Sequence, residues 1–188
     1  MRKIILEEWL SLDGFAADKN NALDFFPSTE ANKFSDEDQL KFLESVDLIL
    51  LGRKTYELFV DFWPQATIDK EIIADKLNLL PKVIVSQTLK DAPWGKWKKA
   101  EVLSGDLIPE IKKLKAQNGK DIVLWGSISI ARALIQENLI DEYHIQICPT
   151  VLGEGKKLFP TSDQYTNLKL VEVRNYPTGV VFLKYENK

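Results

Sequence analysis

The sequence predicts an α/β fold: a mostly parallel central sheet with helices on both faces and an antiparallel hairpin at the C-terminus. Unbroken apolar runs at residues 48–51, 83–85 and 122–125 are typical of strands that are buried on both faces. Stretches with apolar residues at helical spacing separate these runs. Such alternation favours parallel strands joined by helices. Two further runs, at 168–174 and 180–185, flank a turn-rich segment and predict the hairpin.

The N-terminal part predicts a strand, an irregular segment and a helix. Residues 4–10 are rich in β-formers and lead into the turn at 11–14, whereas 16–29 contains several breakers and is expected to be irregular. Ser35 followed by the acidic Asp38 resembles a capping box, so a helix is expected to begin there. Apolar residues follow it at helical spacing: Leu40, Leu43 and, near the helix end, Val46.

The middle of the chain predicts the remaining elements in order. Helices are expected after Gly52, over 69–78, around Ile111 and over 127–137. A short strand is expected at 101–103. Another is expected at 143–147, where apolar residues alternate with His144 and Gln146, so that one of its faces is more polar.

Length and composition favour one domain, spanning residues 1–188, with a substantial core. The chain has 188 residues, of which 45% are hydrophobic. Its 25 basic and 28 acidic residues give a net charge of −3. Because nucleic-acid binding requires a basic excess that displaces counterions, a nucleic-acid partner is not expected.

The numbers of cysteines and histidines argue against a disulfide and against a transition-metal site. Cys148 is the only cysteine and His144 the only histidine, so neither an intramolecular disulfide nor a transition-metal site is expected. His144 stands in the middle of a predicted strand, which favours a structural role. No apolar run is long enough for a signal peptide or a membrane span. We therefore expect a cytoplasmic protein without a membrane partner.

The strand-to-helix junctions are the candidate ligand site. Ligands of open α/β sheets bind outside the carboxyl ends of the strands, where helix N-termini offer free N–H groups and a partial positive charge to phosphates. Gly52 permits close approach of a ligand, and the residues after it, Arg53, Lys54 and Thr55, add cationic and hydroxyl donors. Gly126 and Ser127 repeat the arrangement. Two such junctions on one sheet edge suit a dinucleotide, although no Walker A loop or G-x-G-x-x-G fingerprint is present.

Five motifs resemble members of the dihydrofolate-reductase-like superfamily. LGRKTYE at 51–57 resembles the strand-to-helix motif of dihydrofolate reductases. SLDG at 11–14, LWGS at 124–127, LIDEY at 139–143 and PTVLGEG at 149–155 resemble the C-terminal reductase domain of the bifunctional riboflavin-biosynthesis deaminase-reductase. The motifs occur in the same order over nearly the whole chain, which is therefore identified as a stand-alone reductase domain of this type.

The resemblance implies NADPH as the cofactor and a set of residues that bind it. Gly52, Arg53, Lys54 and Thr55 would bind its phosphates, including the 2′-phosphate that distinguishes NADPH from NADH. Ser86 and Gln87 would lie near the adenosine, and Gly126, Ser127, Ile128 and Ser129 would cradle the pyrophosphate. Trp125 stands where dihydrofolate reductases carry glycine, so it would change the nicotinamide side of the pocket. Relatives of this kind are generally dimeric, which implies a homodimer.

The substrate implied by the resemblance is a small heterocycle, as in 5-amino-6-(5-phosphoribosylamino)uracil reductase. Asp13, in the first turn, is the candidate catalytic residue. Candidate substrate contacts are Asp24, Phe25, the aromatic wall of Trp9 and Trp63, and Gly153 near a ribose phosphate. Dihydrofolate reductases hold the pterin with an acidic residue on their first helix, and the acidic helix opening at Ser35 offers no single match for it. Dihydrofolate reduction is therefore ranked behind the riboflavin-type substrate, as an alternative. A non-catalytic nucleotide-binding module is another, and a phosphotransferase is a third.

Overall fold

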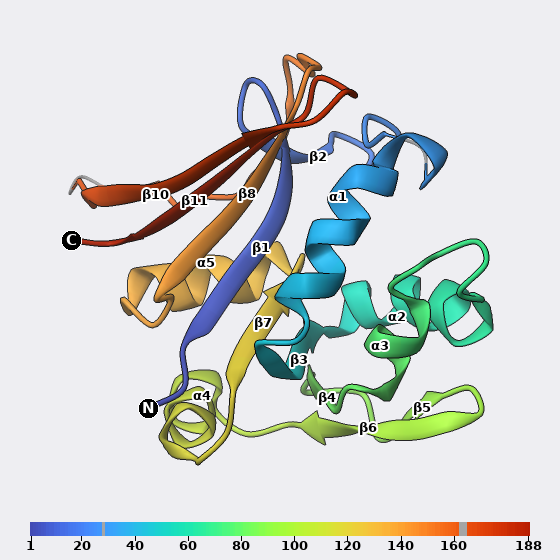
Figure 1. Ribbon diagram of the computed structural model, residues 1–188. Coiled ribbons are helices and arrows are strands. Elements are labelled where there is room, and N and C mark those ends of the chain that lie inside the picture. The colour runs from blue at the N-terminus through green and yellow to red at the C-terminus, as the bar shows by residue number, and fades with distance from the viewer. Residues whose placement is uncertain (28, 162–164) are drawn as a thin grey trace.

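A computed structural model describes residues 1–27, 29–161 and 165–188. Within the first helix it describes the side chains from Ser35 onward. One nine-stranded sheet runs through these residues in the order β10-β11-β8-β1-β7-β3-β4-β6-β5 (Figure 1). Its strands in chain order are β1 (Ile4–Ser11), β3 (Val46–Gly52), β4 (Lys82–Val85), β5 (Ala92–Trp94), β6 (Trp97–Leu103), β7 (Asp121–Trp125), β8 (Glu142–Cys148), β10 (Leu168–Asn175) and β11 (Val181–Asn187). A separate two-stranded sheet joins β2 (Phe15–Asp18) to β9 (Gly155–Lys157).

The centre of the large sheet is parallel and both edges are antiparallel. Neighbouring strands pair parallel from β8 through β1, β7, β3 and β4 to β6. The C-terminal hairpin of β10 and β11 adds antiparallel to β8, and β5 closes the other edge antiparallel to β6. Burial on both faces accounts for the apolar sequence of the central strands, since Ile49, Leu50 and Leu51 are all fully buried. The predicted fold class is confirmed.

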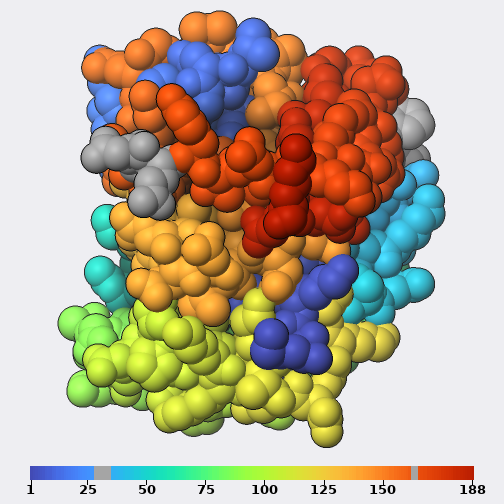
Figure 2. Space-filling view, turned by 90° about the vertical axis from the view of Figure 1, so that its left-hand side faces the viewer, coloured from blue at the N-terminus to red at the C-terminus, as the bar shows by residue number. Residues whose placement is uncertain are grey.

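Helices cover both faces of the sheet. Apolar side chains of α4 (Leu107–Ala116) and α5 (Ile128–Gln136) pack on one face, in a core that contains Ile111, Ala131 and Leu134. The helices of the other face are α1 (Thr29–Phe42), α2 (Arg53–Phe62) and α3 (Ala74–Leu79), and the short 3₁₀ turn Trp63–Gln65 follows α2. Figure 2 shows α4 and α5 lying below the red C-terminal strands. Among the described residues, no helix is long and apolar enough to cross a bilayer.

Several expected boundaries were wrong. The helix expected at Ser35 begins at Thr29, so the apparent capping box lies inside α1, and Val46 belongs to β3 rather than to the helix end. Within the segment expected to be irregular, β2 pairs with β9; residue 28 of that segment lies outside the described residues. The helix expected over 69–78 is only α3, because the chain before it forms turns closed by short-range bonds such as Ala74 N–H to the Glu71 carbonyl at 2.9 Å. Strand β5, which buries Trp94, was not predicted.

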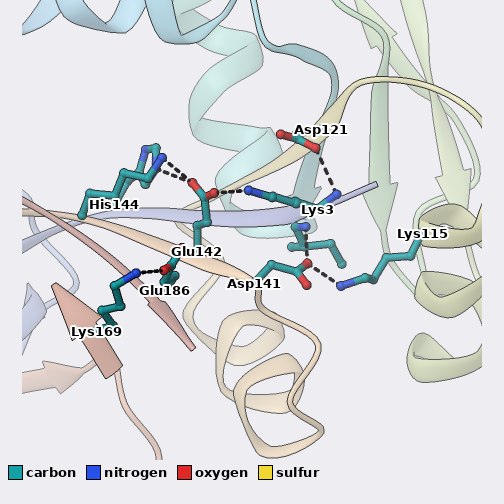
Figure 3. Close-up of polar contacts among 10 residues, drawn as sticks. Lys3, Lys115, Asp121, Asp141, Glu142, His144, Lys169 and Glu186 are labelled. Carbon is teal, nitrogen blue, oxygen red and sulfur yellow. Dashed lines mark hydrogen bonds and ion pairs between the residues drawn. The ribbon is translucent and has the colours of Figure 1, made fainter. Parts of the chain in front are cut away.

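The buried carboxylate of Glu142 joins β8 to β11 and to the residue before β1, and Figure 3 shows its contacts with Lys3 and His144. Glu142, at the start of β8, accepts from Lys3 Nζ at 2.6 Å, pairs with Lys184 of β11 at 2.8 Å, and lies 3.2 Å from His144 Nε2. The hydrogen bond from His144, followed by those from Lys184 and Lys3, holds the pKa of Glu142 below its ordinary value. The His144 ring packs between Phe42 and Phe182, which gives the only histidine a structural environment.

We predict that Glu142→Gln removes stability in a pH-dependent way. Because the folded-state pKa of Glu142 is depressed, its stabilisation is present above the unfolded value near 4.5 and is lost as pH falls below it. At pH 7 the variant should lose roughly 2–3 kcal/mol of unfolding free energy, since hydrogen bonds to a charged group are lost. Urea unfolding from pH 7 to 3 should show the difference shrinking in acid. The control Glu137→Gln, at an exposed position, should change little; a constant Glu142 deficit at every pH would contradict the assignment.

Candidate active site

A cleft opens where strands β1 and β7 separate. Their pairing ends at Glu7 and Trp125, after which β1 continues beside β8 to Ser11 while the chain after β7 turns into α5. The cavity between them has a volume of about 950 Å³ and is lined from both sheet faces, by β1, α1 and the starts of α2 and α5. This is the edge at the carboxyl ends of the parallel strands, where the sequence places the ligand site.

The starts of α2 and α5 are hydrogen-bonded to each other at the floor of this cleft. The Gly52 N–H donates to Ser127 Oγ at 2.7 Å, and the Ser127 N–H donates to Thr55 Oγ1 at 3.0 Å. The two hydroxyl oxygens are also 3.0 Å apart. Although Ser127 is the residue before α5, its side chain does not cap that helix but bonds the other one. Residues 72 to 75 positions apart in sequence are thus held in one cluster.

Two glycines make this close approach possible. A Cβ atom on Gly52 would lie 3.0 Å from Ile130 Cδ1 and 3.2 Å from Ser127 Oγ. A Cβ on Gly126 would lie 3.2 Å from Thr55, and Gly126 has a left-handed φ of +54° that disfavours side chains. Both positions therefore favour glycine, because a larger residue would crowd the contact between the two helix starts.

The first turns of α2 and α5 are open toward the cleft. Neither helix has a side-chain cap among the described residues. In the first turn of α5 the Ile130 N–H donates to the Ser127 carbonyl at 2.8 Å, and no side chain of the described residues caps the N–H groups of Ile128 and Ser129. Arg53 and Lys54 are exposed at the start of α2, and Arg53 Nη1 pairs with Glu57 at 2.7 Å. Uncapped helix N-termini beside exposed cations are an arrangement that suits an anion.

The predicted cofactor residues all line this cleft. They are Gly52, Arg53, Lys54, Thr55, Ser86, Gln87, Trp125, Gly126, Ser127, Ile128 and Ser129. At the end of β4, Ser86 Oγ accepts the N–H of Leu89 at 3.0 Å, which shapes the third junction. The structure thus brings these residues together in one cleft.

The opposite wall carries buried acidic groups that the sequence analysis missed. Glu7 and Glu8 of β1 are each only 6% exposed, and both line the cleft. Glu7 Oε2 accepts from Trp125 Nε1 and from Gln39 Nε2, each at 2.9 Å, while burial raises the pKa of Glu7. Burial raises the pKa of Glu8 to about 8. The signal in the sequence was two consecutive acidic residues inside an otherwise apolar strand.

Helix α1 adds a further carboxyl to this wall. Burial, and then the charge of Glu71, raises the pKa of Asp36 to about 6. Asp36 and Glu71 both line the cleft. The cleft is therefore cationic at the start of α2 and rich in carboxyl groups beside β1 and α1.

The predicted substrate residues divide into two groups. Trp9 and Trp63 line the cleft, and the Trp9 ring lies 5.4 Å from that of Phe26. Asp24, Phe25 and Gly153 are not among the lining residues; Phe25 packs edge-on against Phe26, which takes the place in the wall expected for Phe25.

Asp13, the expected catalytic residue, does not line the cleft. Its carboxylate accepts from Ser11 Oγ at 2.7 Å and from the N–H groups of Leu152 and Gly153 at 3.1 and 2.7 Å. The hydrogen bond from Ser11, followed by those from Gly153 and Leu152, lowers the pKa of Asp13 to about 2. The geometry is that of a turn carboxylate that joins two loops, so Asp13 is not retained as a catalytic candidate. Among the described residues, no cluster of metal-ligating side chains occurs either.

Comparison with known proteins identifies relatives of the whole chain. The model of the RibD C-terminal domain family matches residues 2–182. The uncharacterized protein YyaP of Bacillus subtilis (strain 168) is 34% identical over 98% of this chain and 94% of its own length. A putative riboflavin biosynthesis protein from Shewanella sp. PV-4 has a similar structure, with a TM-score of 0.74, 23% identity and 99% coverage of both chains. A pyrimidine reductase-like protein from Corynebacterium diphtheriae has a TM-score of 0.71 at 17% identity, covering all of this chain and 92% of its own.

We predict that Ser127 and Thr55 are energetically coupled. Ser127→Ala leaves the buried Gly52 N–H without its acceptor, and Thr55→Val removes the acceptor of the Ser127 N–H, so each should cost about 1–2 kcal/mol of unfolding free energy. Because both changes break one cluster, the double variant should cost less than their sum by at least about 0.5 kcal/mol. Urea unfolding of the four proteins measures this, with the exposed Ser104→Ala as control. Strict additivity would mean that the two hydroxyls act independently.

Proposed function

The chain belongs to the RibD C-terminal domain family, and we propose that it is an NADPH-dependent reductase of a pyrimidine or pteridine heterocycle. The observation that carries the proposal is the hydrogen-bonded pair of uncapped helix N-termini, α2 and α5, at the floor of one cleft. A dinucleotide has phosphates at separate positions, and this pair offers two anion sites held at a fixed spacing.

The residues at the junctions fit the phosphates of NADPH. The glycines leave room for a phosphate against the backbone, and the first turns of α2 and α5 supply N–H donors. Arg53 and Lys54 would hold the 2′-phosphate, because they are the exposed cations at the start of α2. When bound, the cofactor supplies the hydride.

The remaining task of the protein is to orient the heterocycle, exclude water and provide a proton. Trp9, Trp63 and Phe26 give the cleft an aromatic wall suited to a flat ring. Glu8 also lines the cleft, from the other face of β1, and burial raises its pKa to about 8, so its carboxyl group holds a proton at neutral pH. Reduction of a C=N or C=O group consumes such a proton together with the hydride.

The substrate proposed is of the type used in riboflavin biosynthesis. The similarity to a putative riboflavin biosynthesis protein and to a pyrimidine reductase-like protein supports this choice over dihydrofolate. The expected homodimer stays a prediction. The exposed apolar side chains of β10, Leu170, Val171 and Val173, are the surface that would serve it.

We expect NADPH to bind more tightly than NADH through Arg53. Titration that follows quenching of the five tryptophans should give an NADPH dissociation constant at least about ten-fold below that of NADH. Arg53→Ala should weaken NADPH by about ten-fold and leave NADH nearly unchanged, because only NADPH carries the 2′-phosphate. The matched control is Glu57→Ala, which frees Arg53 from its ion pair and should not weaken NADPH.

Turnover separates the proposal from its alternatives. Oxidation of NADPH in the presence of an aminouracil or a pteridine is the expected result, and oxidation with dihydrofolate alone would favour the folate alternative. Binding of NADPH without turnover of any of these compounds would favour a non-catalytic module. Absence of nucleotide binding at millimolar concentration would overturn the proposed function.

A further inference from the structure

Gln146 has an amide group that no described residue satisfies. The residue lies in β8 and is 5% exposed, and its Oε1 atom is buried without a hydrogen-bond partner. Nor does any described residue bond its Nε2 atom. Buried amides are almost always paired in folded proteins, because an unpaired group costs about 1–3 kcal/mol. An unpaired one that lines a cleft therefore points to a ligand.

Gln146 borders the cleft. Gln146 is the register partner of Trp9 on β1, and both side chains line the cleft. Gln146 also borders a smaller cavity of about 300 Å³, which is lined by Phe42, His144 and Phe182. Of the two spaces, only the cleft is large enough to hold a heterocycle together with a nucleotide.

Glu7 presents a second unused atom on the same face of the sheet. Glu7 and Trp9 are two residues apart on β1, so their side chains point to the same face, and Glu7 is the register partner of His144 in β8. Both hydrogen bonds to the Glu7 carboxyl group, from Trp125 and Gln39, are made to Oε2. Among the described residues none bonds Oε1. The indole and the amide thus fix the carboxyl group and leave one oxygen for a ligand.

We propose that Gln146 and Glu7 recognise the edge of a lactam heterocycle that lies against Trp9. The amide of Gln146 pairs with a ring –NH–C(=O)– unit, accepting from the N–H through Oε1 and donating to the carbonyl through Nε2. Glu7 Oε1 bonds a neighbouring N–H of the same heterocycle. This inference deepens the proposed function and rests on it, since it names the feature of the substrate that the cleft selects.

The distribution of charge in the cleft agrees with this assignment. The carboxyl groups of Glu7, Asp36 and Glu71 line the same cleft as the proposed subsite, and Glu8 lines it from the other face of β1. Their oxygen atoms can accept N–H donors of a heterocycle, whereas the cations Arg53 and Lys54 lie at the start of α2. The heterocycle and the cofactor phosphates are thus assigned to opposite ends of one cleft.

Lumazine, a pteridine with two ring lactams, and 1,3-dimethyllumazine, in which both ring N–H groups are methylated, test the proposal. Binding is measured by calorimetry with the intact protein, both with saturating NADP⁺ and without it. The wild-type protein should bind lumazine at least about ten-fold more tightly than the dimethyl compound, because methylation leaves Gln146 Oε1 and Glu7 Oε1 without donors.

Two substitutions at one position separate recognition from folding. Gln146→Leu and the nearly isosteric Gln146→Glu, which cannot donate to the ring carbonyl, should each weaken lumazine by about ten- to a hundred-fold. They should abolish the preference over the dimethyl compound and leave NADP⁺ affinity unchanged. The matched control Gln117→Leu, at an exposed position after α4, should behave as wild type.

The outcomes distinguish this inference from the proposed function. Equal binding of lumazine and its dimethyl derivative, lumazine binding by both Gln146 variants as in wild type, or no lumazine binding despite NADP⁺ binding would each overturn the lactam subsite and leave the cofactor site standing. Failure to bind NADP⁺ would overturn the proposed function. In that case the lumazine titration without nucleotide still decides whether the subsite exists.

Discussion

The contact of Ser127 with Gly52 and Thr55 is the constraint on which the arrangement of this cleft depends. It joins the starts of two helices that follow different strands and pack on opposite faces of the sheet. Because each bond uses a backbone N–H of one junction and a hydroxyl of the other, the two helix N-termini cannot move apart without leaving buried donors unpaired. The spacing of the two helix N-termini is thereby fixed, and under the proposed function this reduces the ordering that nucleotide binding would otherwise require.

The second constraint is the divergence of β1 from β7, which opens the cleft beside buried carboxyl groups. Burial of Glu7 is unfavourable for its charged form, and the bonds from Trp125 and Gln39 offset part of that cost. These bonds also fix the orientation of the carboxyl group. Polar groups that the fold holds rigidly but leaves partly unsatisfied, as at Glu7 and Gln146, are typical of binding sites rather than of cores.

Much of the fold, and the gathering of the junction residues in one cleft, could be predicted from the sequence, because both depend on local sequence patterns. Apolar runs such as 122–125 revealed the central strands, and glycine with cationic neighbours after a strand revealed Gly52 and Arg53. Residues whose role arises only from tertiary contacts could not be placed. In the sequence, Gln146 belongs to the polar face of an alternating strand. Only the pairing of β8 with β1 places it beside Trp9 at the cleft. Asp13 had the sequence context of a functional turn, yet two backbone N–H groups some 140 residues away in sequence occupy its carboxylate.

The most direct test of the central claim, that both junctions act as one nucleotide site, is a titration of ¹⁵N-labelled protein with NADP⁺ followed by backbone amide resonances. If both junctions bind one nucleotide, the amide resonances of Arg53 and Lys54 in α2 and those of Ile128 and Ser129 in α5 should shift together, with one shared dissociation constant. Shifts confined to one of the two helix starts, or shifts elsewhere in the chain with both junctions unaffected, would contradict it.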